Sequence, residues 1–167
     1  MRRAIAGGLA AAAAAGCIAA AAGPAVAEER VCRGAIGATT VDNLRVPDGA
    51  SCTLTRTTVK GTVKVETGAR LVARAVRVIG NVQAENHGSV TVVNSRIGGS
   101  VQLKQGRRAN VSGNRITADL QSFTNSGAQT FRNNRINGNL QCKENVPPPA
   151  GGGNVVGGNK EDQCSRL

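Results

Sequence analysis

The sequence predicts an all-β fold, a right-handed parallel β-helix of about six coils with three short strands in each coil. The first observation is a repeated phrase, in which a basic residue beside Val or Ile leads to Val or Leu and then Gln: RVIGNVQ, SRIGGSVQ, NRITADLQ and NRINGNLQ. The second is its spacing of 19 or 20 residues. The third is that apolar, glycine, asparagine and basic positions recur in register, which is typical of a solenoid.

The repeat sets the expected order of elements. Five coils are predicted at 43–61, 62–80, 81–99, 100–118 and 119–138, between an N-terminal cap segment (28–42) and a degenerate last coil with a Pro- and Gly-rich insert and a C-terminal cap (139–167). The first strand of each coil alternates inward apolar and outward polar residues, as in Leu44, Arg45 and Val46. Because 19 and 20 are not multiples of six, the right-handed form is favoured over a left-handed hexapeptide helix. A β-sandwich is the alternative.

The remaining parts of each coil follow the first strand. A glycine-containing turn leads into a second apolar strand, which includes Val90 and Val92 in the third coil. A polar corner comes next, where one column holds Ser95, Asn114 and Asn134. A third, very short strand then places Val or Ile inward. One coil cannot bury its own apolar face, so stability must come from stacking.

The N-terminal 27 residues are interpreted as a secretory signal peptide. Arg2 and Arg3 precede a long Ala-rich run, and Ala25, Val26 and Ala27 form a small-x-small cleavage site. Lipid attachment at Cys17 is an open alternative. Removal of residues 1–27 lowers the formal net charge from +11 to +9. The expected location is secreted, either extracellular or associated with the cell wall, with no membrane span.

Four cysteines remain after cleavage: Cys32, Cys52, Cys142 and Cys164. An even number in an exported chain indicates disulfides. Three pairings are possible, and locality favours Cys32–Cys52 and Cys142–Cys164, each closing a loop that contributes about 3 kcal/mol. Capped ends would prevent end-to-end aggregation, so we expect a monomer. The chain has no Cys-x-x-Cys pair and a single histidine, so we expect neither a metal site nor a cofactor.

One column of basic residues is the candidate site. It contains Arg77, Arg96, Arg115, Arg135 and Lys160, each just before an inward position and therefore directed outward. One interpretation is a track for an anionic cell-wall polymer or acidic polysaccharide. The other is a solubility face that blocks pairing between sheets. The near absence of aromatic residues disfavours specific nucleic-acid binding.

The coil pattern over residues 43–162 resembles right-handed parallel β-helix proteins of the pectate lyase and polygalacturonase architecture, and more weakly the polymer-forming bactofilin-like β-helices. The first resemblance implies clustered acids as calcium ligands or acid/base pairs. Here Glu66 and Glu85 are expected to stack, with Glu144 farther along nearly the same column, while His87 is expected to be a solvated turn residue. No acidic cluster is expected to face the basic column.

These observations favour a non-catalytic protein. We expect an exported structural or binding module of the bacterial cell surface or medium, which engages anionic polymers through its basic column. The alternative is a polysaccharide-active β-helix enzyme, a lyase or hydrolase of acidic polysaccharide. The signal peptide and the disulfide-tied ends depart from the bactofilin-like pattern of uncapped cytosolic stacks.

Overall fold

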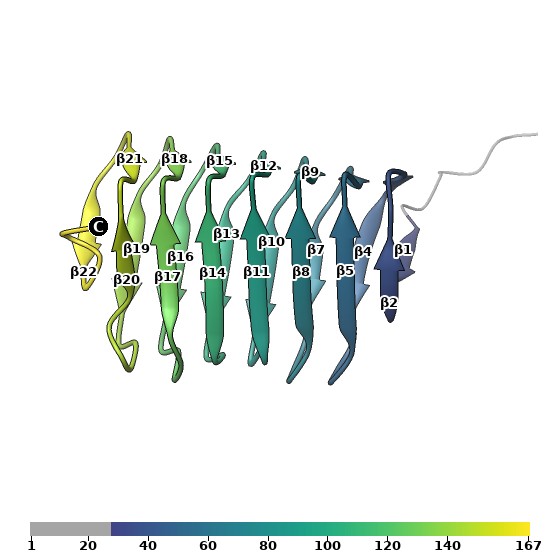
Figure 1. Cartoon of the computed structure of the whole chain (residues 1–167), viewed down its shortest axis with the longest axis horizontal. Helices are drawn as coiled ribbons and strands as arrows, with labels where there is room; N and C mark the ends of the chain where they lie inside the picture. The colour runs from purple at the N-terminus through teal and green to yellow at the C-terminus, as the bar shows by residue number, and fades with distance from the viewer. Residues whose placement is uncertain (1–27) are drawn as a thin grey trace, which may run out of the picture.

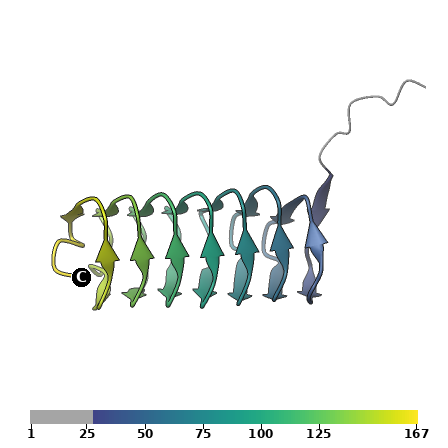
Figure 2. The same ribbon diagram turned by 90° about the horizontal axis from the view of Figure 1, so that it is seen from above.

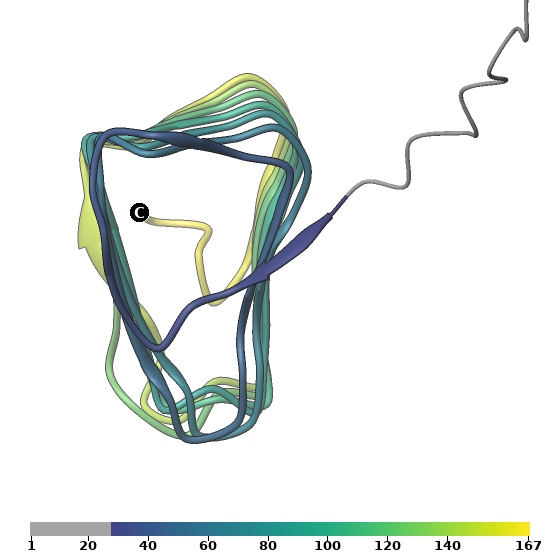
Figure 3. The same ribbon diagram turned by 90° about the vertical axis from the view of Figure 1, so that its right-hand side faces the viewer.

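A computed structural model describes residues 28–167 and shows a parallel β-helix. The expected signal peptide (1–27), with Cys17, lies outside the described residues. The described part contains 22 strands and no helix, wound with three strands per coil into about seven coils (Figure 1). Seen from its N-terminal end, the chain runs clockwise as it recedes, so the helix is right-handed, and its cross-section is roughly triangular (Figure 3). The predicted fold class is confirmed.

Each side of the triangle is one parallel sheet. Sheet A contains β1 (Glu29–Val31), β4 (Asn43–Val46), β7 (Val63–Val65), β10 (Val82–Glu85), β13 (Val101–Lys104), β16 (Leu120–Phe123), β19 (Leu140–Lys143) and β22 (Lys160–Asp162). Sheet B contains β2 (Gly34–Ile36), β5 (Ser51–Thr55), β8 (Arg70–Arg74), β11 (Ser89–Val93), β14 (Arg108–Ser112), β17 (Gln129–Arg132) and β20 (Ala150–Gly152). Sheet C contains β3 (Thr40–Val41), β6 (Thr58–Val59), β9 (Arg77–Val78), β12 (Arg96–Ile97), β15 (Arg115–Ile116), β18 (Arg135–Ile136) and β21 (Val155–Val156).

The coils stack in register, so that residues one repeat apart become neighbours. Val101 pairs with Val82 on one side and with Leu120 on the other. Successive coils form an even, straight row (Figure 2). Neighbouring strands lie about 4.8 Å apart, the usual spacing within a sheet. Any residue type that recurs at one position of the repeat therefore forms a continuous column along the molecule.

The interior is narrow and filled mainly by aliphatic side chains. Strand positions alternate between buried and outward, as in β11, where Val90 and Val92 are buried and their neighbours are not. Phe131 is the one aromatic residue in the described core. Small and β-branched side chains suit both the strand conformation and this thin core. The lack of Trp and Tyr is therefore compatible with a fully packed interior.

Buried asparagines close the corner between sheets B and C. The Asn134 side chain accepts hydrogen bonds from the Asn114 backbone N–H (3.0 Å) and Nδ2 (3.1 Å), and its own Nδ2 donates to the Val111 carbonyl (2.7 Å). Asn154 repeats this pattern one coil later, with Oδ1 accepting from the Asn134 backbone N–H at 3.1 Å. This ladder of asparagine side chains provides hydrogen-bond partners for the backbone groups that leave the sheets at the corner.

The N-terminal segment forms a coil of its own. Strands β1, β2 and β3 pair in parallel with the next coil, for example Thr40 with Thr58. Residues 28–42 therefore continue all three sheets, which accounts for the one coil beyond the predicted six. The Cys32–Cys52 disulfide, with a Cα–Cα distance of 5.6 Å, joins this coil to the second.

The C-terminal end differs from the predicted register. Residues 139–158 match 119–138 in length, so the Pro-rich stretch occupies the turn after sheet A without adding residues. Lys160 pairs with Leu140 in sheet A, and Glu161 pairs with Gln141, so neither lies in the column expected from the sequence. The second strand of this coil is mostly glycine, which left no apolar pattern from which to set the register.

The final residues cover the C-terminal end of the core. The tail turns inward across the triangular outline (Figure 3), and the Leu167 side chain packs against the core. Cys164 is buried and bonded to Cys142, with a Cα–Cα distance of 5.3 Å. Both predicted disulfide pairings are confirmed. The tail, rather than a carboxylate directed into the core, ends the stack.

Replacing Asn134 with Ala should destabilise the fold by about 2–4 kcal/mol, because it leaves buried backbone groups without partners. The free energy of unfolding in urea measures this effect. Asn137→Ala is the matched control, since Asn137 is exposed and should change stability by no more than about 0.5 kcal/mol. Equal effects of the two variants would contradict the stabilising role of the buried asparagine ladder.

Candidate functional site

A row of four arginines runs along sheet C. Arg96 pairs with Arg77 on one side and with Arg115 on the other, and Arg115 pairs with Arg135. All four side chains are exposed, and each precedes a buried Val or Ile. Over three intervals of about 4.8 Å the row spans about 14 Å. The structure therefore brings together these four of the five basic residues selected from the sequence.

Lys160 does not belong to this row. It lies on sheet A, and the position next to Arg135 is taken by Val155. The sequence register failed here because the Gly-Asn-basic triplet around Lys160 looks like the one around Arg115. In the structure that triplet leads into sheet A of the next turn.

Further arginines on sheet B extend the basic surface. Arg70 and Arg74 lie on β8, Arg108 on β14 and Arg132 on β17, all exposed. In two coils the basic residues flank the corner between the sheets, three positions apart: Arg74 with Arg77, and Arg132 with Arg135. The corner residue between them has a positive φ, 52° at Ala75, which gives a sharp turn between the two arginines.

From the second coil onward, acidic residues are absent from this half of the molecule; in the first coil Asp42 directly follows β3 and pairs with Lys60. Within the described chain, the stretches that build sheets B and C contain no Asp or Glu: 51–60, 70–79, 89–98, 107–118, 128–138 and 150–158. The basic residues of the strands and the corner between them are all arginine. This acid-free pattern was present in the sequence and is the signal by which the sheet B arginines could have been found.

The arginine row lacks counter-charges. No ion pair within residues 28–167 involves any of its four members; the three ion pairs there involve Arg45 and Lys60. Two like charges about 4.8 Å apart repel by roughly 0.9 kcal/mol even in water. A shallow hollow of about 190 Å³ lies along the row, between Arg77, Arg96 and Arg115. This surface can bind a linear anion, because each coil offers a fixed guanidinium at a regular interval.

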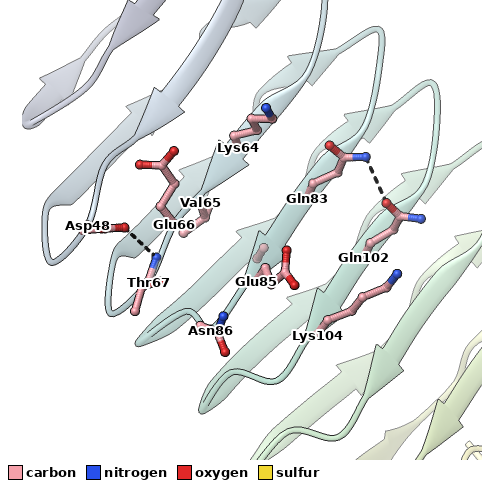
Figure 4. Close-up of a pocket in the computed structure, with 11 residues that line it drawn as sticks. Asp48, Lys64, Val65, Glu66, Thr67, Gln83, Glu85, Asn86, Gln102 and Lys104 are labelled. Carbon is pink, nitrogen blue, oxygen red and sulfur yellow. Dashed lines mark hydrogen bonds between the residues drawn. The ribbon is translucent and has the colours of Figure 1, made fainter.

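Sheet A has a different surface, with a hollow of about 520 Å³ over its N-terminal half. Lys64, Gln83 and Gln102 form one row across the hollow, and Glu85 and Lys104 lie on neighbouring strands beside them (Figure 4). The acids here are not a metal cluster: in the described part of the chain no three His, Cys, Asp or Glu side chains are placed to hold a metal ion.

The acidic column expected from the sequence is shorter than predicted. Glu66 and Glu85 follow paired residues on adjacent strands, but the column continues with Lys104, which pairs with Glu85. Glu144 lies at the next position, which has a positive φ of 57°. Glu66 accepts a hydrogen bond from Arg45 Nη1 (3.3 Å), and Arg45 Nε also binds Glu29 (2.7 Å). These two hydrogen bonds raise the pKa of Arg45.

His87 is buried, which corrects the expectation of a solvated turn residue. Its exposed fraction is 0%, and neither imidazole nitrogen has a hydrogen-bond partner. The positive φ of Asn86 (51°) turns the next residue inward, where the ring fills the space beside Gly106. Later coils place Asn125 at the same position. Burial lowers the pKa of His87 from 6.5 to about 4, and the Ala84 backbone opposes this shift weakly.

Comparisons with known proteins give no match, so the class of this protein is assigned from its structure alone. No protein-family model matches the chain, and no curated protein or solved structure matches it significantly. Over the described residues, no helix has the length and apolar character needed to cross a membrane. The geometry defines the class as a disulfide-bonded parallel β-helix repeat protein with one acid-free, arginine-rich side.

The buried His87 should make stability depend on pH. Between pH 6.5 and about 4 the unfolded chain binds a proton at His87 and the folded chain does not, so stability falls as the pH decreases. The free energy of unfolding should be about 2 kcal/mol lower at pH 5 than at pH 7.5. Urea unfolding at both values tests this. The variant His87→Asn should lack that part of the pH dependence, and an unchanged dependence would contradict the assignment.

Proposed function

We propose that this protein is an exported, non-catalytic binding module that holds an anionic polymer along sheets B and C. The single observation that carries the proposal is the unneutralised row Arg77, Arg96, Arg115 and Arg135, set in a surface without acidic residues. A surface made only for solubility would be expected to mix both signs of charge. Here the strands of sheets B and C carry basic residues and no acidic ones, which favours binding.

The residue type favours oxyanions as the bound groups. Guanidinium groups bind phosphate, sulfate or carboxylate through two parallel hydrogen bonds, whereas a Lys ammonium acts as a point charge. The arginines are concentrated on sheets B and C, and Lys64, Lys104 and Lys143 lie on sheet A. A flexible polymer with regularly repeated anions, such as an anionic cell-wall polymer or acidic polysaccharide, can contact several coils at once.

Export and the lack of catalysis complete the proposal. Two disulfides suit an oxidising environment outside the cytosol. Several groups that could serve an enzyme are engaged elsewhere or hidden: the four described cysteines are bonded, His87 is buried, and Glu66 is paired with Arg45. The tied ends also argue against open-ended stacking of coils between molecules.

The triple variant Arg96→Gln, Arg115→Gln and Arg135→Gln should bind heparin at least about tenfold more weakly at low salt, because three charge contacts are lost. The matched control is Lys64→Gln, Lys104→Gln and Lys143→Gln, which removes the same charge from sheet A; all proteins are titrated at a concentration at which each is monomeric. Titration at rising salt measures both. Binding that is insensitive to salt, or that is weakened equally by the two triple variants, would overturn the proposed site.

Incubation with acidic polysaccharides should release no unsaturated or reducing ends above the blank, because we propose no catalytic group. Ultraviolet absorbance and reducing-end assays detect the two products. Turnover above the blank would instead support the alternative function, a polysaccharide lyase or hydrolase with the β-helix architecture.

A further inference from the structure

Sheet A is nearly neutral, in contrast to the two arginine-bearing sheets. Its outward columns hold four basic and four acidic residues on or beside strands β4 to β22: Arg45, Lys64, Lys104, Lys143, Glu66, Glu85, Asp119 and Glu161. The exposed Lys160 and Asp162 of the last strand add one residue of each sign. The two signs balance over this face. A balanced, flat surface promotes association, whereas like charges on sheets B and C oppose it.

The side-chain hydrogen bonds of the central column on this face all point in one direction along the molecule. Gln83 Nε2 donates to Gln102 Oε1 (3.1 Å), and the same bond is repeated from coil to coil through Gln121 and Gln141 at 3.1 and 2.9 Å. The last amide donates to Glu161 Oε2 at 2.8 Å. At the opposite end the same column continues from Gln83 to Lys64 and then to Arg45. The column therefore has two cations at one end, a carboxylate at the other and neutral amides between them.

The neighbouring column is also asymmetric, in shape as well as charge. It runs Glu85, Lys104, Phe123 and Lys143 on successive strands. The hollow of about 520 Å³ lies over the half that contains Glu85 and Lys104. The other half carries Phe123, the one aromatic outside the described core, and the exposed Lys143. Glu85, Lys104 and Lys143 form no ion pair within residues 28–167.

We propose that sheet A is the contact face of a weak homodimer, in which a second copy lies face to face with its coils in the reverse order. The two-fold axis runs parallel to the strands, midway between β13 and β16. Strand β13 then faces the partner's β16, β10 faces β19 and β7 faces β22. Glu85 meets Lys143 of the partner subunit, Lys64 meets the partner's Glu161, and Lys104 meets the partner's Phe123.

Charge complementarity selects this arrangement. Each contact occurs twice, giving four ion pairs and two cation–π contacts. In the third column Ser100 faces the partner's Asp119, so no like charges meet. An axis along the solenoid would instead place Lys64 against its own copy. Sheets pack about 10 Å apart face to face, a gap that extended Lys and Glu side chains bridge.

The size of the face sets the strength of the dimer. Six strands about 4.8 Å apart, each with four residues rising about 3.3 Å, cover close to 400 Å² per copy. The total of about 800 Å² is below the size of a standard specific interface, so the dimer is weak, transient and sensitive to salt. The expectation of a monomer rested on the capped ends alone and did not consider this lateral face. Pairing through sheet A leaves both arginine surfaces free, so a dimer can bind one polymer at two places.

Sedimentation equilibrium of the full chain over a wide concentration range tests the proposal. We expect a monomer–dimer equilibrium at low salt that shifts to monomer at high salt. Glu85→Lys or Lys143→Glu alone should lower the association constant about tenfold or more, since each creates two like-charge contacts. The double variant should recover to within about threefold of the original. Glu85 and Lys143 are three strands apart, about 14 Å, so they can restore each other only between molecules.

A control variant on sheet B and three defined outcomes complete the test of the dimer. Arg132→Glu makes the same charge change as Lys143→Glu but lies on sheet B, and should leave association unchanged. Circular dichroism of each variant checks that the fold is intact. A monomer at every concentration in low salt, or no recovery in the double variant, would overturn the proposal. Recovery by Glu85→Lys with Lys104→Glu instead would overturn the proposed register, because those residues face each other only if the axis lies one strand away.

Discussion

The architecture depends on parallel hydrogen bonding between successive coils in a fixed register. Each coil donates backbone N–H groups to carbonyls one repeat away, as from Arg96 to Val76 at 2.9 Å and from Arg115 to Ser95 at 2.9 Å. This register turns a repeat in the sequence into columns in space. The apolar core, the asparagine corner, the amide column of sheet A and the arginine row are four results of this one constraint.

The same constraint explains why charge can be sorted by side. The three sheets face three directions, and each position of the repeat belongs to one sheet. A bias at a few repeat positions is therefore enough to make one side cationic and another neutral. Arginine at the start of most sheet C strands and the exclusion of Asp and Glu from the second half of every coil after the first produce the cationic side. The fold supplies the spacing, and side-chain chemistry supplies the selectivity.

Much of the fold was predictable because the inward columns repeat closely. Val82, Val101 and Leu120 revealed the register in the sequence, and the cysteine pairs followed from locality. The prediction failed at positions where the side chains no longer show the alternation of apolar and polar residues. Gly151 and Gly152 form a strand with no side chain to identify it, so Lys160 was assigned to the wrong sheet. His87 was misplaced because the direction of a residue after a positive-φ turn depends on backbone geometry, which the repeat spacing does not encode.

Nuclear Overhauser contacts between backbone protons test the stacking most directly. The account predicts a series of contacts between residues 19 or 20 apart, linking Gln83 to Gln102 and Gln102 to Gln121, and repeated on all three sheets. Contacts between residues of adjacent antiparallel strands joined by short turns, with no series at the repeat distance, would contradict it. In that case the arginines would not form a row, and the functional proposals would lose their basis.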